Sequence, residues 1–199
     1  MHTERTFIAI KPEGIQRRLI GEIIGKFEKK GLKLVAAKLT SPSVEKVEEH
    51  YQADEEWFES SGNRTLDNYK AKGIDPGMTA RELAIRTRKR CIDHLANRTI
   101  FAMVWEGSHA VQVGRKLAGH TNPLAAESGT VRGDFSIESY EMADGHERSI
   151  LNMLHASGAV EEAEREIALW FDKDEVLDYD MVDQQIILSN DWGKVKQKK

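Results

Sequence analysis

Cysteine is almost absent from this sequence, since Cys91 is the single one among 199 residues. One thiol cannot form an internal disulfide, which excludes the disulfide frameworks that stabilise small secreted domains. Cys91 lies in a basic, helix-patterned stretch, where a packed or idle thiol is expected rather than a nucleophile. Because the first residues, Met-His-Thr-Glu-Arg, lack the basic and apolar regions of a signal peptide, the expected location is the cytoplasm.

Long apolar runs and a strong charge imbalance are also missing. No run approaches the roughly 18 residues that a membrane helix needs, so we expect no membrane partner. The net charge is −4, with 31% charged and 40% hydrophobic residues, which is ordinary for a globular protein and argues against nucleic-acid binding. No Gly-x4-Gly-Lys loop is present, which excludes a P-loop kinase. The length favours a single domain over 1–199, with insertions.

Apolar stretches and their periodicity predict the secondary structure. Short apolar runs predict strands at Thr6–Ile10, Leu34–Leu39, Thr99–Trp105 and Phe135–Ile137, the first of them central. Apolar residues three and four positions apart predict core-facing helices over about 20–30, 43–51, 108–118 and 160–171. The order β-α-β, helix, β-α-β indicates a ferredoxin-like α+β sandwich, with a four-stranded antiparallel sheet covered by helices.

Two stretches interrupt this compact pattern. Residues 60–97 contain glycine and proline and then a helix that starts at Thr79, which predicts a helical insertion with its own structure or task. Residues 138–150 form a second insertion. From about 180 a C-terminal extension leads to a solvated tail that ends in Lys194, Lys196, Lys198 and Lys199.

The most informative motif is Asn152-x-x-His155-x-Ser157, with Glu166 eleven residues after the histidine on a helix-patterned stretch. A neutral imidazole attacks a phosphoryl group and later returns it when a carboxylate holds its other ring nitrogen. His155 is therefore the candidate nucleophile and Glu166 the candidate orienting group. Taken alone, any one of the seven histidines would more often be an ordinary polar surface residue than a catalytic one.

Four segments, taken in order, closely resemble the nucleoside diphosphate kinase family: residues 4–14, which read Glu-Arg-Thr-Phe-Ile-Ala-Ile-Lys-Pro-Glu-Gly; residues 115–123; residues 129–135, which read Gly-Thr-Val-Arg-Gly-Asp-Phe; and the histidine cluster. The resemblance covers most of the chain. It implies transfer of the terminal phosphoryl group from a nucleoside triphosphate to a nucleoside diphosphate through a phosphohistidine, with ping-pong kinetics. Such a reaction would maintain nucleotide pools. It also implies Mg²⁺ bound through the nucleotide phosphates, with no metal site built by the protein, and a homo-oligomer that is a tetramer or hexamer.

The resemblance assigns roles residue by residue. Lys11 would lie beside the transferring phosphate; Arg115, Thr121 and Arg132 would grip the polyphosphate, since guanidinium groups bind phosphate oxygens in bidentate fashion. Asn152 would bond a sugar hydroxyl or a phosphate oxygen, and Tyr51 would border the site. The base would stack on Phe58 or, second, on Trp57. Taken alone, each of these cations is more often a solvated surface charge.

Two histidines compete for the catalytic role. His146 follows Arg132 by fourteen residues, close to the family interval, whereas His155 follows it by twenty-three. The local context favours His155, and an insertion of about ten residues in the preceding loop accounts for the longer interval. The loop after His155 reads Ala-Ser-Gly-Ala where the family has Gly-Ser-Asp-Ser, which places rate and nucleotide preference in question.

Two other functions stay open. A relay kinase would pass the phosphate from His155 to a protein side chain. A scaffold would keep the fold without turnover and offer the basic residues Arg86, Arg88, Lys89 and Arg90 to a partner, although such residues more often form a solvated helix face.

Overall fold

A four-stranded antiparallel sheet forms the centre of the molecule in the computed structural model, which describes residues 3–183. The strands are arranged in the order β2-β3-β1-β4, so the first strand is central, as predicted. They are β1 (Thr3–Ile10), β2 (Lys33–Thr40), β3 (Ile100–Ser108) and β4 (Leu154–Ala156). The predicted tail lysines lie outside the described residues.

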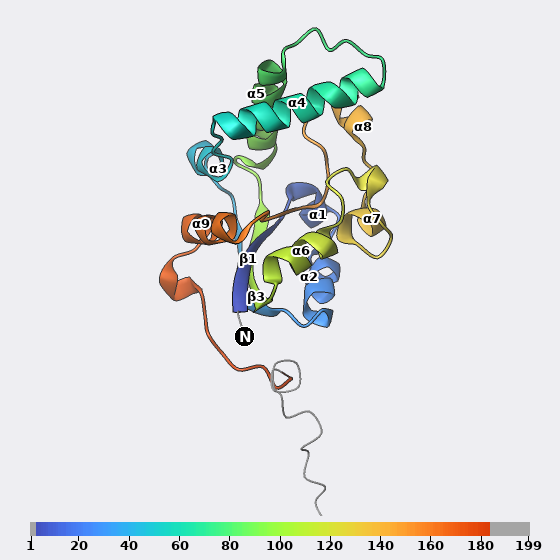
Figure 1. Cartoon of the computed structure of the whole chain (residues 1–199). Coiled ribbons are helices and arrows are strands. Elements are labelled where there is room, and N and C mark those ends of the chain that lie inside the picture. The colour runs from blue at the N-terminus through green and yellow to red at the C-terminus, as the bar shows by residue number, and fades with distance from the viewer. Residues whose placement is uncertain (1–2, 184–199) are drawn as a thin grey trace, which may run out of the picture.

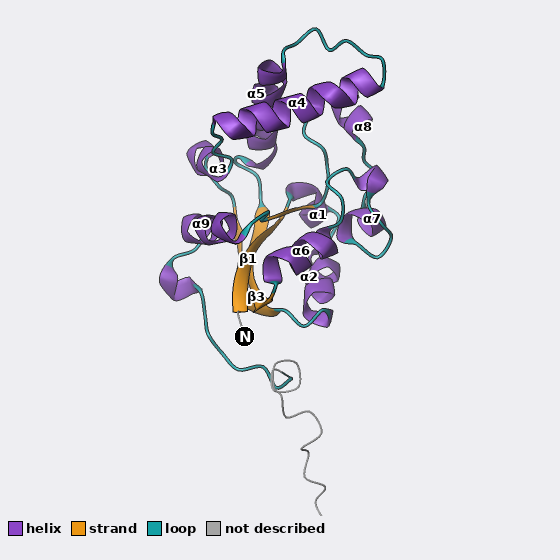
Figure 2. Cartoon of the chain, viewed as in Figure 1, coloured by secondary structure: helices purple, strands orange, loops and turns teal. Residues whose placement is uncertain are grey.

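Helices cover this sheet and extend beyond one end of it (Figures 1 and 2). They are α1 (Pro12–Gln16), α2 (Ile20–Lys29), α3 (Val44–His50), α4 (Glu55–Ala71), α5 (Ala80–Leu95), α6 (Ala110–Ala118), α7 (Val131–Phe135), α8 (Tyr140–Gly145) and α9 (Val160–Trp170), with 3-10 turns at Pro123–Ala125 and Lys173–Glu175. The α+β sandwich with a ferredoxin-like strand order is therefore confirmed.

Alternation along β1 divides the core into two. Phe7 and Ala9 face the side covered by α3, α5 and α9, where they pack with Trp170. Ile8 and Ile10 face the side covered by α2, α6 and α7, where they pack with residues such as Phe27. Because successive side chains of a strand point to opposite faces, one strand contributes to both cores.

The predicted fourth strand at Phe135–Ile137 is wrong. Thr130 caps a helix there, its hydroxyl accepting a hydrogen bond from the Gly133 amide, and Phe135 is the last residue of that helix, α7. The fourth strand is β4, which pairs antiparallel with residues 8–10 of β1. Three residues are too few to show an alternating pattern, and their strand conformation depends on this tertiary pairing.

Helices α4 and α5 form a hairpin that overlaps the predicted insertion at 60–97, although α4 begins earlier, at Glu55. The predicted start at Thr79 is confirmed, because Thr79 and Glu82 form a reciprocal capping box at the beginning of α5. Helix α4 was not predicted. It crosses the top of the molecule in Figure 1, from the end of α3 to α8.

The C-terminal segment crosses the outer edge of β2. The Leu177 amide donates to the Val35 carbonyl over 2.8 Å, and the Tyr179 hydroxyl donates to the Leu34 carbonyl over 2.8 Å. Lys33 and Lys38 of β2 form ion pairs with Asp178 and Glu175. No helix in residues 3–183 has the length and apolar character that crossing a membrane requires.

Candidate active site

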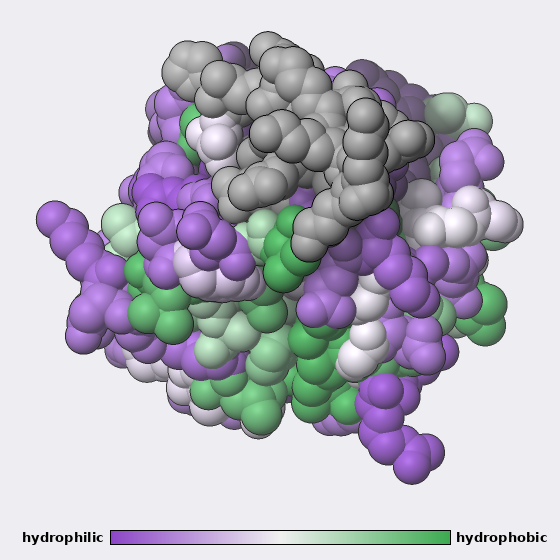
Figure 3. All heavy atoms as spheres, turned by 90° about the horizontal axis from the view of Figure 1, so that it is seen from below, coloured by the Kyte–Doolittle hydropathy of each residue, from purple (hydrophilic) through white to green (hydrophobic). Residues whose placement is uncertain are grey.

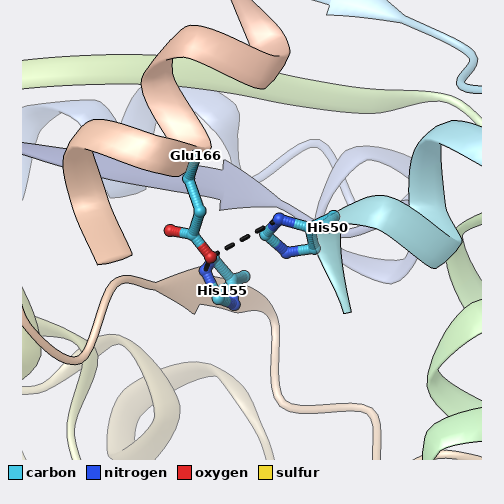
Figure 4. Close-up of side chains that lie close together, drawn as sticks. All are labelled: His50, His155 and Glu166. Atoms are coloured by element: carbon cyan, nitrogen blue, oxygen red, sulfur yellow. Dashed lines mark ion pairs between the residues drawn. The ribbon is translucent and has the colours of Figure 1, made fainter. Parts of the chain in front are cut away.

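His155 lies in β4, opposite Ala9 of β1. Its neighbours Leu154 and Ala156 belong to the core beneath α2 and α6, so the alternation of the strand turns the imidazole toward α3 and α9. The side chain is 15% exposed, and its Nε2 atom lies 2.8 Å from Oε1 of Glu166 (Figure 4). Among the described residues, none forms a hydrogen bond with Nδ1, which leaves that nitrogen available to react.

Glu166, on α9, is held in place by a hydrogen bond to its other carboxylate oxygen, Oε2. Its side chain is 1% exposed, and Oε2 accepts a hydrogen bond of 2.6 Å from the Ser157 hydroxyl. That hydroxyl in turn accepts from the Phe7 amide of β1 over 3.1 Å. Burial raises the pKa of Glu166, while His50, the Ser157 bond and Arg165 act in the opposite direction.

The contact between Glu166 and His155 is close but lacks hydrogen-bond angles. Nε2 of His155 is buried and has no other hydrogen-bond partner within the described chain. Glu166 is the carboxylate that this nitrogen faces, and no other described acceptor forms a hydrogen bond with it. We therefore regard the contact as the one that fixes the tautomer, with the proton on Nε2 and the lone pair on Nδ1.

His50, the last residue of α3, is a member of the site that was not predicted. Its Nδ1 atom lies 3.4 Å from Oε1 of Glu166 and accepts a hydrogen bond of 3.2 Å from the Trp170 indole. Its ring meets the His155 ring edge-on, with centroids 4.5 Å apart. A single helical histidine beside Tyr51 carries no spacing signal, so only the fold reveals this contact.

Both imidazoles are neutral at neutral pH. Burial, followed by the positive charges of Lys11, Arg132 and Arg115, outweighs the opposing charge of Glu162 and lowers the pKa of His155 to about 3. Burial also lowers the pKa of His50 to about 3, with the charge of His155 adding to the effect. A neutral imidazole keeps the lone pair that nucleophilic attack requires.

His50, His155 and Glu166 also have the composition of a metal site. Their donor atoms lie within 4.8 Å of one another. The Trp170 N–H, however, points at the His50 lone pair that a metal ion would need. The cluster therefore fits a hydrogen-bonded network better than a metal centre.

Lys11 and Asn152 meet where β1 ends. The Lys11 ammonium donates to Oδ1 of Asn152 over 2.7 Å, and Nδ2 of Asn152 donates to the Thr121 carbonyl over 2.9 Å. Burial lowers the pKa of Lys11, with Glu13 and Cys91 opposing this and Arg132 adding to it. Three predicted residues thus come together, although Thr121 takes part through its backbone.

A strained turn directly precedes β4. Met153 has a φ of 70°, and the Leu154 amide bonds to the Asn152 carbonyl over 2.8 Å, which describes a γ-turn. A non-glycine residue with positive φ costs free energy and persists only when its surroundings hold it. Here Oε1 of Glu13 accepts from the Met153 amide, and the Lys11 amide donates to the Met153 carbonyl.

Arg132 clamps the same turn. Its guanidinium donates to the carbonyls of Asn152, Leu154 and Gly119 over 3.1, 2.9 and 2.8 Å, and the residue is 3% exposed. Burial, together with the charge of Arg115, lowers the pKa of Arg132 to about 10. Since a guanidinium has five N–H groups, some stay available for the predicted phosphate contact, but this backbone clamp was not foreseen.

Arg115, by contrast, is exposed on α6. Its guanidinium donates to the Ala156 carbonyl over 3.3 Å, one residue beyond His155. This places an exposed cation beside the end of β4, with one donor used in the described structure. The arrangement suits the predicted role in binding an anionic ligand.

Known proteins resemble this arrangement along nearly the whole chain. A family model described as nucleoside diphosphate kinase matches residues 4–62 and 87–176. The chain belongs to the nucleoside diphosphate kinase family. Residues 63–86, which the match omits, lie inside the α4–α5 hairpin.

Several relatives are named nucleoside diphosphate kinase. The nucleoside diphosphate kinase of Pyrobaculum aerophilum is 40% identical over 183 residues, covering 89% of this chain and 100% of its own. Human nucleoside diphosphate kinase 3 is 40% identical over 177 residues, covering 87% of this chain and 80% of its own. This kinase is accordingly a phosphotransferase that acts on nucleotides.

Solved structures agree. The NDP kinase from Pyrobaculum aerophilum superimposes with a TM-score of 0.85 at 39% identity, over 89% of this chain and all of the other. A nucleoside-diphosphate kinase from Borrelia burgdorferi, a transition state mimic with bound vanadate and ADP, gives 0.75 at 32% identity, over 92% and 96% of the two chains.

Tyr51 borders the histidine cluster of the kinase. Its ring is perpendicular to that of His155, with centroids 6.4 Å apart. Burial raises the pKa of its phenol well above the ordinary value, so the hydroxyl stays protonated and able to donate. This position fits the predicted role at the edge of the site.

Phe58 and Trp57 lie on α4, outside the cluster formed by His155, His50 and Glu166. Their rings contact each other at 5.4 Å, and the Arg81 guanidinium lies 5.2 Å from the centroid of the Phe58 ring. No aromatic contact between either ring and His155 is present among the described residues. The choice of stacking residue therefore stays a prediction.

His146, the competing histidine, lies away from this cluster. It is an exposed residue at the C-terminal end of α8. Within the described chain its ring forms neither a hydrogen bond nor an ion pair. The geometry supports His155 over His146 as the candidate nucleophile.

Proposed function

We propose that the kinase transfers the terminal phosphoryl group of a nucleoside triphosphate to a nucleoside diphosphate through a phosphohistidine at His155. The observation that carries this proposal is a neutral imidazole whose Nε2 faces the buried carboxylate of Glu166 and whose Nδ1 has no hydrogen-bond partner among residues 3–183. That combination fixes one nitrogen and leaves the other nucleophilic.

In the first half-reaction, the Nδ1 lone pair attacks the terminal phosphorus, and the bond from that phosphorus to the bridging oxygen breaks. The diphosphate leaves with the bonding electrons, while the phosphorylated ring keeps its Nε2 proton against Glu166. In the second half-reaction, a terminal oxygen of another diphosphate attacks the phosphohistidine, and the P–N electrons return to Nδ1. Phosphohistidine therefore separates two chemically equivalent transfers.

The surrounding cations favour this transfer, because charge spreads over phosphate oxygens as the phosphoryl group moves. Lys11 contacts Asn152 just before β4, Arg115 contacts the carbonyl of its last residue, Ala156, and Arg132 adds a third positive charge at the carbonyl of its first residue, Leu154. The substrate is the magnesium complex of the triphosphate. The donors around His155 are mainly nitrogen atoms, which Mg²⁺ does not favour, so the phosphates would hold the ion.

Intact-mass measurement after incubation with Mg²⁺ and ATP tests the proposal. We expect the mass of one phosphoryl group to be added, to be lost in acid, and to be lost on addition of GDP with formation of GTP. His155→Asn should abolish the gain, and the matched His146→Asn variant should retain it. Phosphorylation that persists in His155→Asn would overturn the assignment.

We also propose a cytoplasmic homo-oligomer, a tetramer or hexamer. Large apolar side chains are exposed, such as Leu39 of the edge strand β2 at 58% and Ile137 at 89%. The view from below shows apolar side chains gathered across the middle of one face (Figure 3). Surfaces of this kind mark association sites. Light scattering coupled to size exclusion would give the mass of the assembly, and a monomer would refute the proposal.

A further inference from the structure

The two inserted segments are joined by a cluster of polar contacts centred on Asp144 of α8. Its carboxylate accepts from the Tyr69 hydroxyl of α4 over 2.7 Å and from the Arg90 guanidinium of α5 over 2.7 Å. Arg86 of α5 donates to the Tyr69 hydroxyl over 3.1 Å, and Lys72 lies 2.8 Å from Glu141. We call these five residues, together with Asp144, the clasp.

The clasp joins two segments that border the candidate site. Helix α4 begins four residues after Tyr51, whereas α8 leads through residues 146–151 to Asn152 and β4. Figure 1 shows α4 extending across the top of the molecule until it reaches α8. The clasp therefore links the chain that follows Tyr51 to the chain that precedes Asn152.

The charges of the two segments also meet here. Burial raises the pKa of Tyr140, the first residue of α8, while the charges of Arg64 and Arg132 oppose that shift. Arg64 belongs to α4 and Arg132 to the clamp beneath β4. The charges of Arg64 and Arg132 thus both act on the phenol of Tyr140.

Asp144 is well suited to this connecting role. Its side chain is 37% exposed, yet each of its oxygens has a separate partner on a different helix. Hydrogen bonds to a charged group are stronger than neutral ones, and two partners fix the direction of the carboxylate. Loss of Asp144 would remove a bond from α8 to each helix of the hairpin at once and leave only the exposed Lys72–Glu141 pair of the clasp.

We propose that Asp144 is a positioning residue: its bonds to the α4–α5 hairpin hold residues 140–152 across the mouth of the nucleotide site and slow nucleotide release. The inference rests on the proposed site at His155. It concerns the binding and release of the nucleotide and not the transfer step, since none of the clasp residues touches His155 in the described structure.

The test compares Asp144→Ala and Tyr69→Phe with matched controls whose side chains form no hydrogen bond or ion pair with α8 in the described structure. Asp67→Ala removes an aspartate that lies 3.7 Å from Lys70 on exposed α4, and Tyr179→Phe removes a hydroxyl at the β2 edge. The readouts are the dissociation constant and the dissociation rate of ADP, measured by calorimetry and by stopped-flow displacement of a fluorescent ADP analogue.

For Asp144→Ala we expect the ADP dissociation rate and dissociation constant to rise about tenfold, with a smaller rise for Tyr69→Phe and none for the controls. Phosphohistidine formation at saturating triphosphate should keep its rate, and Asp144→Glu should restore part of the affinity. Unchanged ADP binding in both clasp variants, even with lowered thermal stability, would overturn the inference.

Cys91 supplies a second measurement. It is the single cysteine, and its sulfur lies 3.7 Å from the Ser149 hydroxyl, beneath the clasp. Alkylation by iodoacetamide should be faster in Tyr69→Phe than in Tyr179→Phe, and equal rates would count against the inference. These readouts need no turnover. An absence of phosphohistidine in the unaltered chain would therefore refute the proposed function, while the effect of the clasp variants on ADP binding and on Cys91 alkylation could still be measured.

Discussion

At the scale of residues, the two buried imidazoles make stability depend on pH. Their pKa values are about 3 in the folded chain against an ordinary value of 6.5, so the unfolded chain binds more protons between these limits. The free energy of unfolding is therefore fully retained above about pH 6.5 and falls as the pH drops toward 3.

We predict that each imidazole lowers the free energy of unfolding by about 2 kcal/mol between pH 7 and pH 5. Urea unfolding at the two pH values measures this loss. His50→Gln should reduce it, whereas His146→Gln, at an exposed position, should leave it unchanged. An equal pH dependence in His50→Gln and the unaltered chain would contradict the assigned burial effect.

The two site arginines should respond differently to replacement by lysine. Arg132→Lys loses the fork that holds three carbonyls around the strained turn, so we expect a loss of about 3 kcal/mol in unfolding free energy and a lower transfer rate. Arg115→Lys, at an exposed position, should change stability by less than about 0.5 kcal/mol while raising the KM for nucleotide. Denaturant unfolding and initial rates separate the two effects.

At this scale, sequence motifs mark the residues of the candidate site. Spacing from Arg132 favoured His146, and the neighbours Asn152, Ser157 and Glu166 favoured His155, which is the one the structure surrounds with a carboxylate and cations. His50 and the Arg132 clamp were missed because neither contact follows from local sequence. Both arise where distant elements meet.

At the scale of elements, Gly62 allows α4 to lie close to the start of α5. An added Cβ at Gly62 would be 2.1 Å from the Ala80 carbonyl oxygen, so the backbone would have to shift. We predict that Gly62→Ala separates the hairpin and lowers the unfolding free energy by about 1–3 kcal/mol.

Gly25, in α2, is the matched control. An added Cβ there meets nothing within 4 Å, so Gly25→Ala should stabilise the helix by about 0.4–1 kcal/mol. Thermal unfolding of the two variants gives the comparison. Equal melting temperatures would mean that the close approach of α4 to α5 contributes nothing to stability.

Element prediction succeeded where signals were local. The apolar stripes gave α2 and α9, and the Thr79 cap gave the start of α5. It failed at β4, whose three residues are too few to establish a pattern, and at α4, whose polar composition gives a weak apolar stripe. In both cases partners far away in the sequence determine the conformation.

At the scale of the whole molecule, the C-terminal segment covers an otherwise open sheet edge. Open edges invite pairing with other chains. We predict that a chain of residues 1–171 unfolds about 1–3 kcal/mol more easily than a chain of residues 1–183 and associates more readily, because it loses the bonds to Val35, Lys33 and Lys38.

Chemical unfolding and light scattering of the two shortened chains test this prediction. The chain of residues 1–183 retains Leu177, Asp178 and Tyr179. It therefore controls for the removal of residues 184–199, which both shortened chains lack. Identical midpoints and identical masses would show that the segment neither stabilises nor shields the edge.

His155 is a strand residue flanked by core side chains, so its ring has no freedom to travel between ligands. In the proposed reaction, donor and acceptor must then occupy one place in alternation. Whichever nucleotide is abundant will occupy that place at the wrong stage as well as the right one. Each substrate is thus an inhibitor of the other's half-cycle, and throughput peaks when triphosphate and diphosphate are present in balanced amounts.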